Sequence, residues 1–129
     1  MDIATHKTID RELCGTPLAM GEGYCKVTLT TVNRMAVDDK GLVHGGFVFG
    51  LADYAAMLAV NHPNVVLAGA EVKFTKPVRA GETLTAEATV DRVENRKHMV
   101  TVSVKRENAE VFNGRFSCFI LEAHVLDKT

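Results

Sequence analysis

Hydrophobic and polar residues alternate along most of the C-terminal half of the chain, which is the pattern of half-buried strands. The alternation predicts four strands there, at residues 70–75, 83–90, 98–105 and 111–121. A fifth strand is predicted at residues 24–31, where Cys25, Val27 and Leu29 share one face. The turns between the last four strands are short and polar, as antiparallel hairpins require.

Residues 45–61 break this alternation and predict one long helix. The segment is rich in Ala, Leu and Met, exceeds the usual length of a strand and is followed by Pro63. A helix that is hydrophobic on all sides must be buried on all sides. A sheet of about five strands wrapped around it buries most of its surface, and a second copy of the chain can bury the rest. We therefore expect an α+β domain spanning residues 1–129 that works as an oligomer. A short helix is also expected at residues 7–13.

The amino-acid composition argues against two classes of partner, nucleic acids and membranes. Fifteen basic and sixteen acidic residues leave a net charge of −1, and no basic stripe of the kind that binds nucleic acid is present. Residues 46–60 form the longest apolar segment, but Asp53 interrupts it and it is shorter than a membrane span. The N-terminus has no signal-peptide pattern, and three widely spaced cysteines lack any CxxC motif. We expect a cytoplasmic protein with free thiols and no membrane partner.

Asp53 and Gly45 are the strongest candidates for chemistry. A carboxylate in an apolar helix either accepts structural hydrogen bonds, from a neighbouring strand or from the backbone of a partner chain, or has a pKa that suits it to base or nucleophile work. Gly45 and Gly46 at the helix start either expose backbone N–H groups as an oxyanion hole or allow close packing. Eight residues of helix separate Gly45 from Asp53 by roughly 12 Å. If both are catalytic, the Asp53 of one chain must face the Gly45 N–H of another across a two-fold axis.

The sequence contains few other candidates for catalytic or ligand-binding residues. The chain has no Gly-x-Ser-x-Gly motif for a nucleophilic serine, and its five histidines lack metal-ligand spacing. We therefore expect no metal site. His44 has either a site role or a capping role at the helix start. Arg79, Arg96 and Lys97 lie at predicted strand ends, where they either bind phosphates or are simply solvated.

The segment His44-Gly45-Gly46-Phe47-Val48-Phe49-Gly50-Leu51-Ala52-Asp53-Tyr54 resembles the HGG…LAD signature of hotdog-fold thioesterases of the phenylacetyl-CoA (PaaI-like) type. The resemblance extends from about Tyr24 through the segment around Pro77. It implies a hotdog fold, in which an antiparallel sheet of five or six strands wraps around one long central helix. It also implies a homodimer or homotetramer, and hydrolysis of a small aryl- or acyl-CoA at the subunit interface. Coenzyme A belongs to the substrate, and no other cofactor is implied.

The same resemblance implies roles for individual residues. Asp53 is the expected base or nucleophile, Gly45 of the partner chain polarises the thioester carbonyl, and His44 shapes the site. The residues expected to contact substrate are Gly46, Asp38, Phe47, Tyr54, Met57, Arg79, Arg96 and Lys97.

The chain departs from the family pattern at two places. Asp38 stands where these enzymes often carry Asn, and an ionised carboxylate cannot donate a hydrogen bond as an amide does. An apolar residue near Leu67 replaces a polar residue found in some relatives. Two other function classes thus remain open, namely a non-catalytic acyl-CoA-binding protein and a hotdog hydratase or dehydratase. The latter needs a paired His and acid, which the sequence does not place near Asp53.

Overall fold

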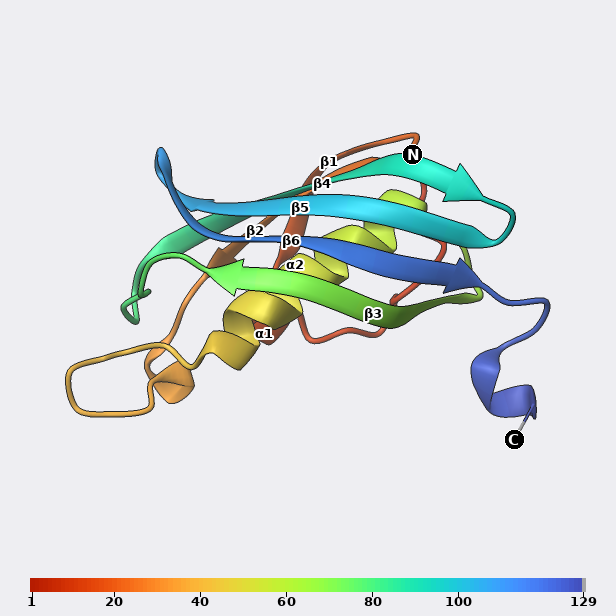
Figure 1. Ribbon diagram of the computed structural model, residues 1–129. Coiled ribbons are helices and arrows are strands. Elements are labelled where there is room, and N and C mark those ends of the chain that lie inside the picture. Colours follow the sequence, from red (N-terminus) through yellow and green to blue (C-terminus); the bar gives the residue numbers. More distant parts are fainter. Residues whose placement is uncertain (129) are drawn as a thin grey trace.

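One antiparallel sheet of six strands wraps around a single long helix (Figure 1). The computed structural model describes residues 1–128. The strands lie in the order β1-β2-β4-β5-β6-β3. Their bounds are β1 Thr16–Gly21, β2 Tyr24–Thr30, β3 Val65–Phe74, β4 Thr83–Glu94, β5 Lys97–Arg106 and β6 Ala109–Ile120. The helices are α1 Arg11–Cys14 and α2 Gly45–Val60, with short 3-10 turns at Asn33–Met35 and Val125–Lys128. The predicted α+β fold, with five or six strands around one helix, is confirmed.

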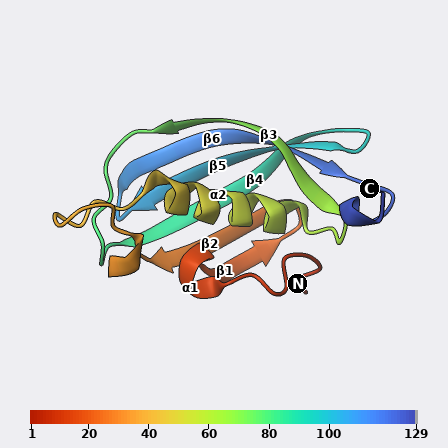
Figure 2. The ribbon, with the colours of Figure 1, turned by 90° about the horizontal axis from the view of Figure 1, so that it is seen from below.

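The helix α2 begins and ends where the backbone conformation changes. His44 precedes it in an extended conformation, and Asn61 follows it in the left-handed region with φ 52°. Asn tolerates this region better than most residues, so it ends the helix cleanly before Pro63. The sheet covers one side of α2, and α1 lies under part of the other side (Figure 2). None of the helices within residues 1–128 is long and apolar enough to cross a bilayer.

The structure corrects three sequence expectations about elements. The helix expected at residues 7–13 is instead the four-residue α1, because the Asp10 carboxylate caps it by accepting from the N–H groups of Glu12 and Leu13. The strand β1 was not predicted, since Pro17 and a register shift after it break the alternation. The strand β3 is longer than residues 70–75, because a second register shift between Leu67 and Gly69 hides its first half.

The strand β3 forms one edge of the sheet. It is ten residues long and pairs with β6 on one side only. Within residues 1–128 no strand lies on its other side, so a row of backbone N–H and C=O groups faces outward. Natural proteins usually shorten or cover such an edge, because it pairs readily with another strand.

An aromatic cluster fills the space between α2 and the β6 side of the sheet. Phe116 is fully buried, and its ring centroid lies 5.5 Å from that of Phe49 and 6.4 Å from that of Phe112. We expect Phe116→Ala to lower the free energy of unfolding by about 3–5 kcal/mol, because it removes a buried ring and leaves a cavity. Urea denaturation measures this loss. Phe74→Ala, at a ring that is 55% exposed, is the control, and an equal loss in both variants would contradict the assignment of Phe116 to the core.

Candidate active site

The N-terminus of α2 presents backbone N–H groups at the positive end of the helix dipole. The His44 side chain makes no capping hydrogen bond to this end. The N–H of Phe47 donates to the His44 carbonyl at 3.0 Å, whereas the N–H groups of Gly45 and Gly46 precede any carbonyl that the helix could offer them. These two donors are therefore suited to binding a negatively charged oxygen.

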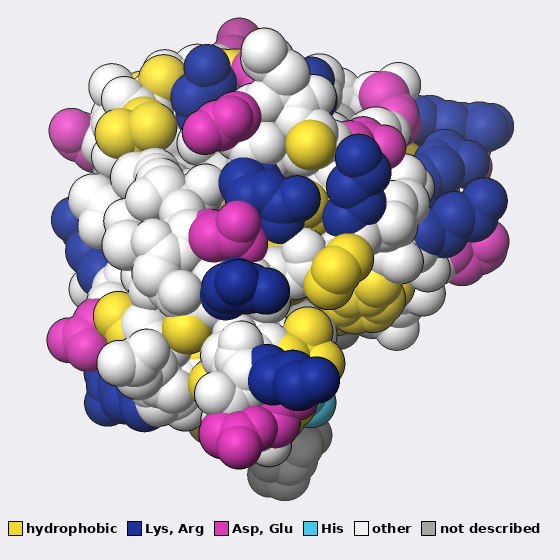
Figure 3. Space-filling view, turned by 90° about the vertical axis from the view of Figure 1, so that its left-hand side faces the viewer, with side chains coloured by type: hydrophobic (Ala, Val, Ile, Leu, Met, Phe, Trp, Pro, Cys, Tyr) yellow, Lys and Arg dark blue, Asp and Glu magenta, His cyan; other side chains and the backbone are white. Residues whose placement is uncertain are grey.

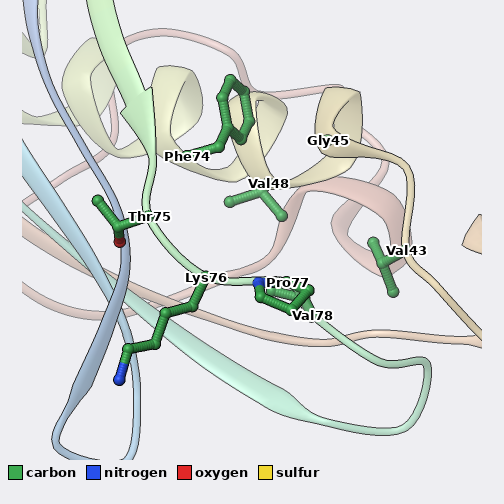
Figure 4. A pocket seen from close by; sticks show the side chains of 8 residues that line it. All are labelled: Val43, Gly45, Val48, Phe74, Thr75, Lys76, Pro77 and Val78. Carbon is green, nitrogen blue, oxygen red and sulfur yellow. The ribbon is translucent and has the colours of Figure 1, made fainter.

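A cavity of about 320 Å³ opens beside this helix end (Figure 4). It is lined by Val43, Gly45, Val48, Phe74, Thr75, Lys76, Pro77 and Val78. In Figure 4 the Phe74 ring stands over the first turns of α2, whereas the Lys76 side chain extends away from Gly45. The lining beside the helix N–H groups is thus mostly apolar. Such a lining strengthens the interaction of an N–H donor with a developing negative charge.

Because they lack a Cβ atom, the two glycines at this helix end leave space for the rings of Phe74 and His44. A Cβ at Gly45 would lie 3.1 Å from Cε1 of Phe74, and one at Gly46 would lie 2.9 Å from the His44 ring. The packing interpretation of the glycine pair therefore holds for both positions. It does not compete with the oxyanion interpretation, because the packing uses the missing Cβ atoms and the oxyanion hole uses the N–H groups.

Asp53 lies two turns further along α2, and its carboxyl group is half-buried. Within residues 1–128 its buried Oδ1 atom has no hydrogen-bond partner. Burial raises the pKa of this carboxyl group from 3.8 to about 6, and no basic group contributes to the shift. The structural interpretation requires a hydrogen bond from a neighbouring strand or from the backbone of a partner chain. The described chain provides none to Oδ1, which leaves the partner chain as the structural alternative. A carboxylate with a pKa near 6 is well matched to accepting a proton near neutral pH.

The charge of Asp53 contributes to the pKa of two nearby cysteine thiols. Burial raises the pKa of Cys118 to about 12, and Asp53 contributes to that rise. Burial also raises the pKa of Cys14, with smaller contributions from Asp10 and Asp53. Both thiols therefore stay protonated at neutral pH and provide no reactive thiolate. No sequence pattern indicates this proximity, because the three residues come from α1, α2 and β6.

Four other residues expected at the site differ in their exposure. His44 is exposed and Phe47 is half-buried, and their rings meet edge to face with centroids 6.1 Å apart. Tyr54 and Met57 are each 1% exposed, so within one chain they belong to the core rather than to an open site.

Asp38 and Arg79 come together at a second cavity of about 420 Å³, which shares Pro77 and Val78 with the first. The Asp38 carboxylate accepts from the backbone N–H groups of Lys40 at 3.0 Å and Leu42 at 3.2 Å. It thereby holds the turn of the loop before α2, a role that an Asn side-chain oxygen would also fill. Lys40 lines this second cavity too, although the sequence did not single it out.

Arg96 and Lys97 lie at the β4–β5 turn, at the opposite end of the sheet from Gly45 (Figure 1). The Arg96 guanidinium forms an exposed ion pair with Glu122 at 2.6 Å. The chain therefore does not bring these two residues together with Arg79. The end of the molecule that holds both cavities carries a band of Lys and Arg side chains with acidic residues among them (Figure 3). Within residues 1–128 no group of His, Cys, Asp and Glu gathers closely enough to hold a metal ion.

Comparison with known proteins identifies the family to which this chain belongs. The sequence profile of the thioesterase superfamily matches residues 40–112, the segment that contains both Gly45 and Asp53. The chain also resembles a solved structure, the uncharacterized protein PH1136 from Pyrococcus horikoshii. The TM-score is 0.97 at 54% identity, over 98% of both chains.

Curated relatives carry different names. The chain is 53% identical over 116 residues to methylthioribose-1-phosphate isomerase of Aquifex aeolicus, covering 90% of this chain and 25% of that protein. It is 32% identical over 111 residues to transcription factor FapR of Caldanaerobacter subterraneus, covering 86% and 55%. It is 34% identical over 92 residues to acyl-coenzyme A thioesterase PaaI of Escherichia coli, covering 66% and 65%. The chain thus spans between a quarter and about two thirds of the length of these relatives.

Proposed function

Because the chain belongs to the thioesterase superfamily, we propose that it hydrolyses a small acyl- or aryl-CoA thioester where two copies of the chain meet. The observation on which this proposal rests is Asp53, a half-buried carboxyl group with an unpartnered Oδ1 and a pKa of about 6. An unpaired carboxylate in an apolar setting destabilises the fold. Its presence eight residues after an exposed helix N-terminus is best explained by catalysis.

The site requires a second chain because Gly45 and Asp53 are roughly 12 Å apart along one helix. Pairing of two β3 edges is antiparallel across a two-fold axis, so it also sets the two α2 helices antiparallel. Gly50 lies between the two site residues, and a Cβ built there meets no atom within 4 Å. A partner helix can therefore approach α2 closely at Gly50. That approach places Asp53 of each chain near Gly45 of the other, and two such dimers can form a tetramer.

In the proposed reaction the Asp53 carboxylate accepts a proton from a water molecule as the water oxygen attacks the thioester carbonyl carbon. The Gly45 N–H of the partner chain donates to the carbonyl oxygen, which becomes negatively charged in the tetrahedral intermediate. Collapse of the intermediate breaks the C–S bond, and the coenzyme A thiolate takes the proton from Asp53. Direct attack by the carboxylate is the second route, in which an anhydride forms and water then hydrolyses it.

The pH dependence of the reaction follows from the state of Asp53. The carboxylate is the active form, and burial raises its pKa to about 6. We therefore expect kcat/KM to be low below pH 5, to rise through pH 6 and to level off above pH 7. Initial rates of thiol release across this range measure the profile. A profile that stays flat between pH 5 and 7 would show that Asp53 does not titrate in the rate-determining step.

The second cavity suggests how the phosphates of coenzyme A are held. Lys40 and Arg79 line it, and neither side chain forms an ion pair within residues 1–128. We expect Arg79→Gln to raise KM for an acyl-CoA by about tenfold, because it removes a charge-assisted hydrogen bond. KM for the matching N-acetylcysteamine thioester, which has no phosphate, should not change. Equal effects on both substrates would place Arg79 outside the phosphate site.

Similarity to transcription factor FapR, a relative whose name indicates no hydrolytic activity, favours a second candidate. This candidate is a protein that keeps the cleft, binds acyl-CoA there and does not hydrolyse it. A panel of aryl, short-chain and medium-chain acyl-CoA thioesters separates the two functions. Thiol release from one class supports the thioesterase. Binding of acyl-CoA by calorimetry without thiol release from any member would favour the binding protein.

A further inference from the structure

A cavity near the chain termini lies at the opposite end of α2 from Gly45. It measures about 550 Å³ and is lined by the N-terminal segment, the start of β3 and the C-terminal segment. Figure 2 shows both chain ends gathered at this end of the helix. Its lining residues are Ala4, Thr5, His6, Lys7, Thr8, Pro63, Asn64, Val65, Val66, His124 and Val125. None of them belongs to the proposed thioesterase site.

The N-terminal segment that forms one wall is held firmly in place. The side chain of Asn61, which ends α2, accepts from the Ala4 N–H at 2.8 Å and donates to the Asp2 carbonyl at 2.9 Å. Thr5 is only 7% exposed, and its hydroxyl is hydrogen-bonded to Nδ1 of His6 at 2.9 Å. His6 has a left-handed backbone with φ 54°, an uncommon and strained conformation for a residue other than glycine. The N-terminal segment is therefore an ordered part of the fold that forms this wall of the cavity.

All the ionisable side chains that line the cavity are basic, namely those of His6, Lys7 and His124. The whole chain, by contrast, has one more acidic than basic residue. His124 accepts the Leu126 N–H on Nδ1 at 3.1 Å, so its neutral ring carries the proton on Nε2 and can donate it to a ligand. The Lys7 ammonium adds a full positive charge, and the Thr8 hydroxyl and the Asn64 amide add further donors.

We propose that this cavity binds the phosphate group of a small phosphorylated molecule. The volume falls within the range of small-molecule sites. The donors come from three separate segments of the chain, and a phosphate monoester offers three acceptor oxygens and up to two negative charges to them. The apolar side chains of Pro63, Val65 and Val125 leave room beside the phosphate for the rest of the molecule.

The test is a titration of the protein of residues 1–129 with inorganic phosphate, monitored by the amide resonances of a ¹⁵N-labelled sample. We expect saturable shifts at residues 5–8, Asn64 and His124. We expect Lys7→Gln and His124→Gln each to weaken this binding by about tenfold. Lys26→Gln, which removes a lysine from the outer face of β2, is the matched control and should leave the binding unchanged. Shifts confined to other residues, or variants that bind as tightly as the parent protein, would overturn the proposal.

Competition by two organic phosphates shows which kind of molecule carries the bound phosphate group. Adenosine 3′,5′-bisphosphate carries phosphates of the nucleotide end of coenzyme A, and ribose 5-phosphate represents an unrelated metabolite. If the bisphosphate displaces inorganic phosphate from the cavity at the lower concentration, the site holds the tail of the thioester substrate. The reverse order supports a separate phosphorylated ligand. If neither compound competes for these residues, the result contradicts the site, whether or not the protein proves to be a thioesterase.

Discussion

Replacing Asp53 by Asn is expected to lower kcat for thioester hydrolysis by a factor of about 10²–10⁴. Asn keeps the size of the side chain but can neither accept the proton of the attacking water nor attack the carbonyl itself. Thiol release from the best acyl-CoA of the panel measures the loss. Asp39→Asn, which removes a carboxylate from the exposed loop before α2, is the matched control and should retain full activity.

Stability measurements separate this loss from unfolding. The pKa of Asp53 is raised in the folded chain, so the folded state binds more protons than the unfolded state between pH 4 and 6. Stability therefore falls as pH rises through this window, and the charged carboxylate destabilises the fold above it. Asp53→Asn removes that cost, so its Tm should equal or exceed that of the parent protein at pH 8. A variant with full activity would exclude Asp53 from the chemistry, whatever its Tm.

Replacing Gly45 by Pro is expected to lower kcat by a factor of about 10²–10³ relative to Gly45→Ala. Proline removes the N–H donor, whereas alanine keeps it, and both add a Cβ that meets the Phe74 ring. The backbone accepts this substitution, because Gly45 is the first helical residue and His44 already has the extended conformation required before proline.

The comparison between the two Gly45 variants isolates the hydrogen bond from the packing. We expect Gly45→Ala to cause a moderate change in KM as Phe74 shifts, and Gly45→Pro to add a large loss in kcat. If both variants lose the same activity, the N–H contributes nothing and Gly45 serves only to accommodate the Phe74 ring. Circular dichroism of both variants verifies that α2 remains intact.

The sequence predicted most of the fold because the pattern is regular where the strands are. Residues 24–31 and 98–105 alternate without interruption, and β2 and β5 match them to within one residue at each end. The strand β1 and the first half of β3 escaped prediction because register shifts break their alternation. The short helix expected at residues 7–13 was placed too early and made too long, since the position of α1 depends on the Asp10 cap rather than on an apolar face.

The site was predictable only as far as it lies on one helix. Gly45 and Asp53 both belong to α2, so their spacing could be read from the sequence and converted into a distance. The ring of Phe74 over Gly45 and the proximity of Cys118 to Asp53 depend on how the strands fold back onto the helix. No local pattern encodes such contacts. Arg79 and Arg96 looked equivalent in the sequence, yet the fold places them at opposite ends of the sheet.

A mixed dimer tests the central claim most directly, namely that each site combines Asp53 of one chain with Gly45 of another. Asp53→Asn and Gly45→Pro proteins, each inactive alone, are unfolded together, refolded as an equal mixture and assayed. If the site is shared, half of the dimers contain one chain of each kind, and each of these has one intact site. Activity should then return to about a quarter of that of the parent protein. Formation of mixed dimers, verified by mass spectrometry, without any return of activity would contradict the shared site.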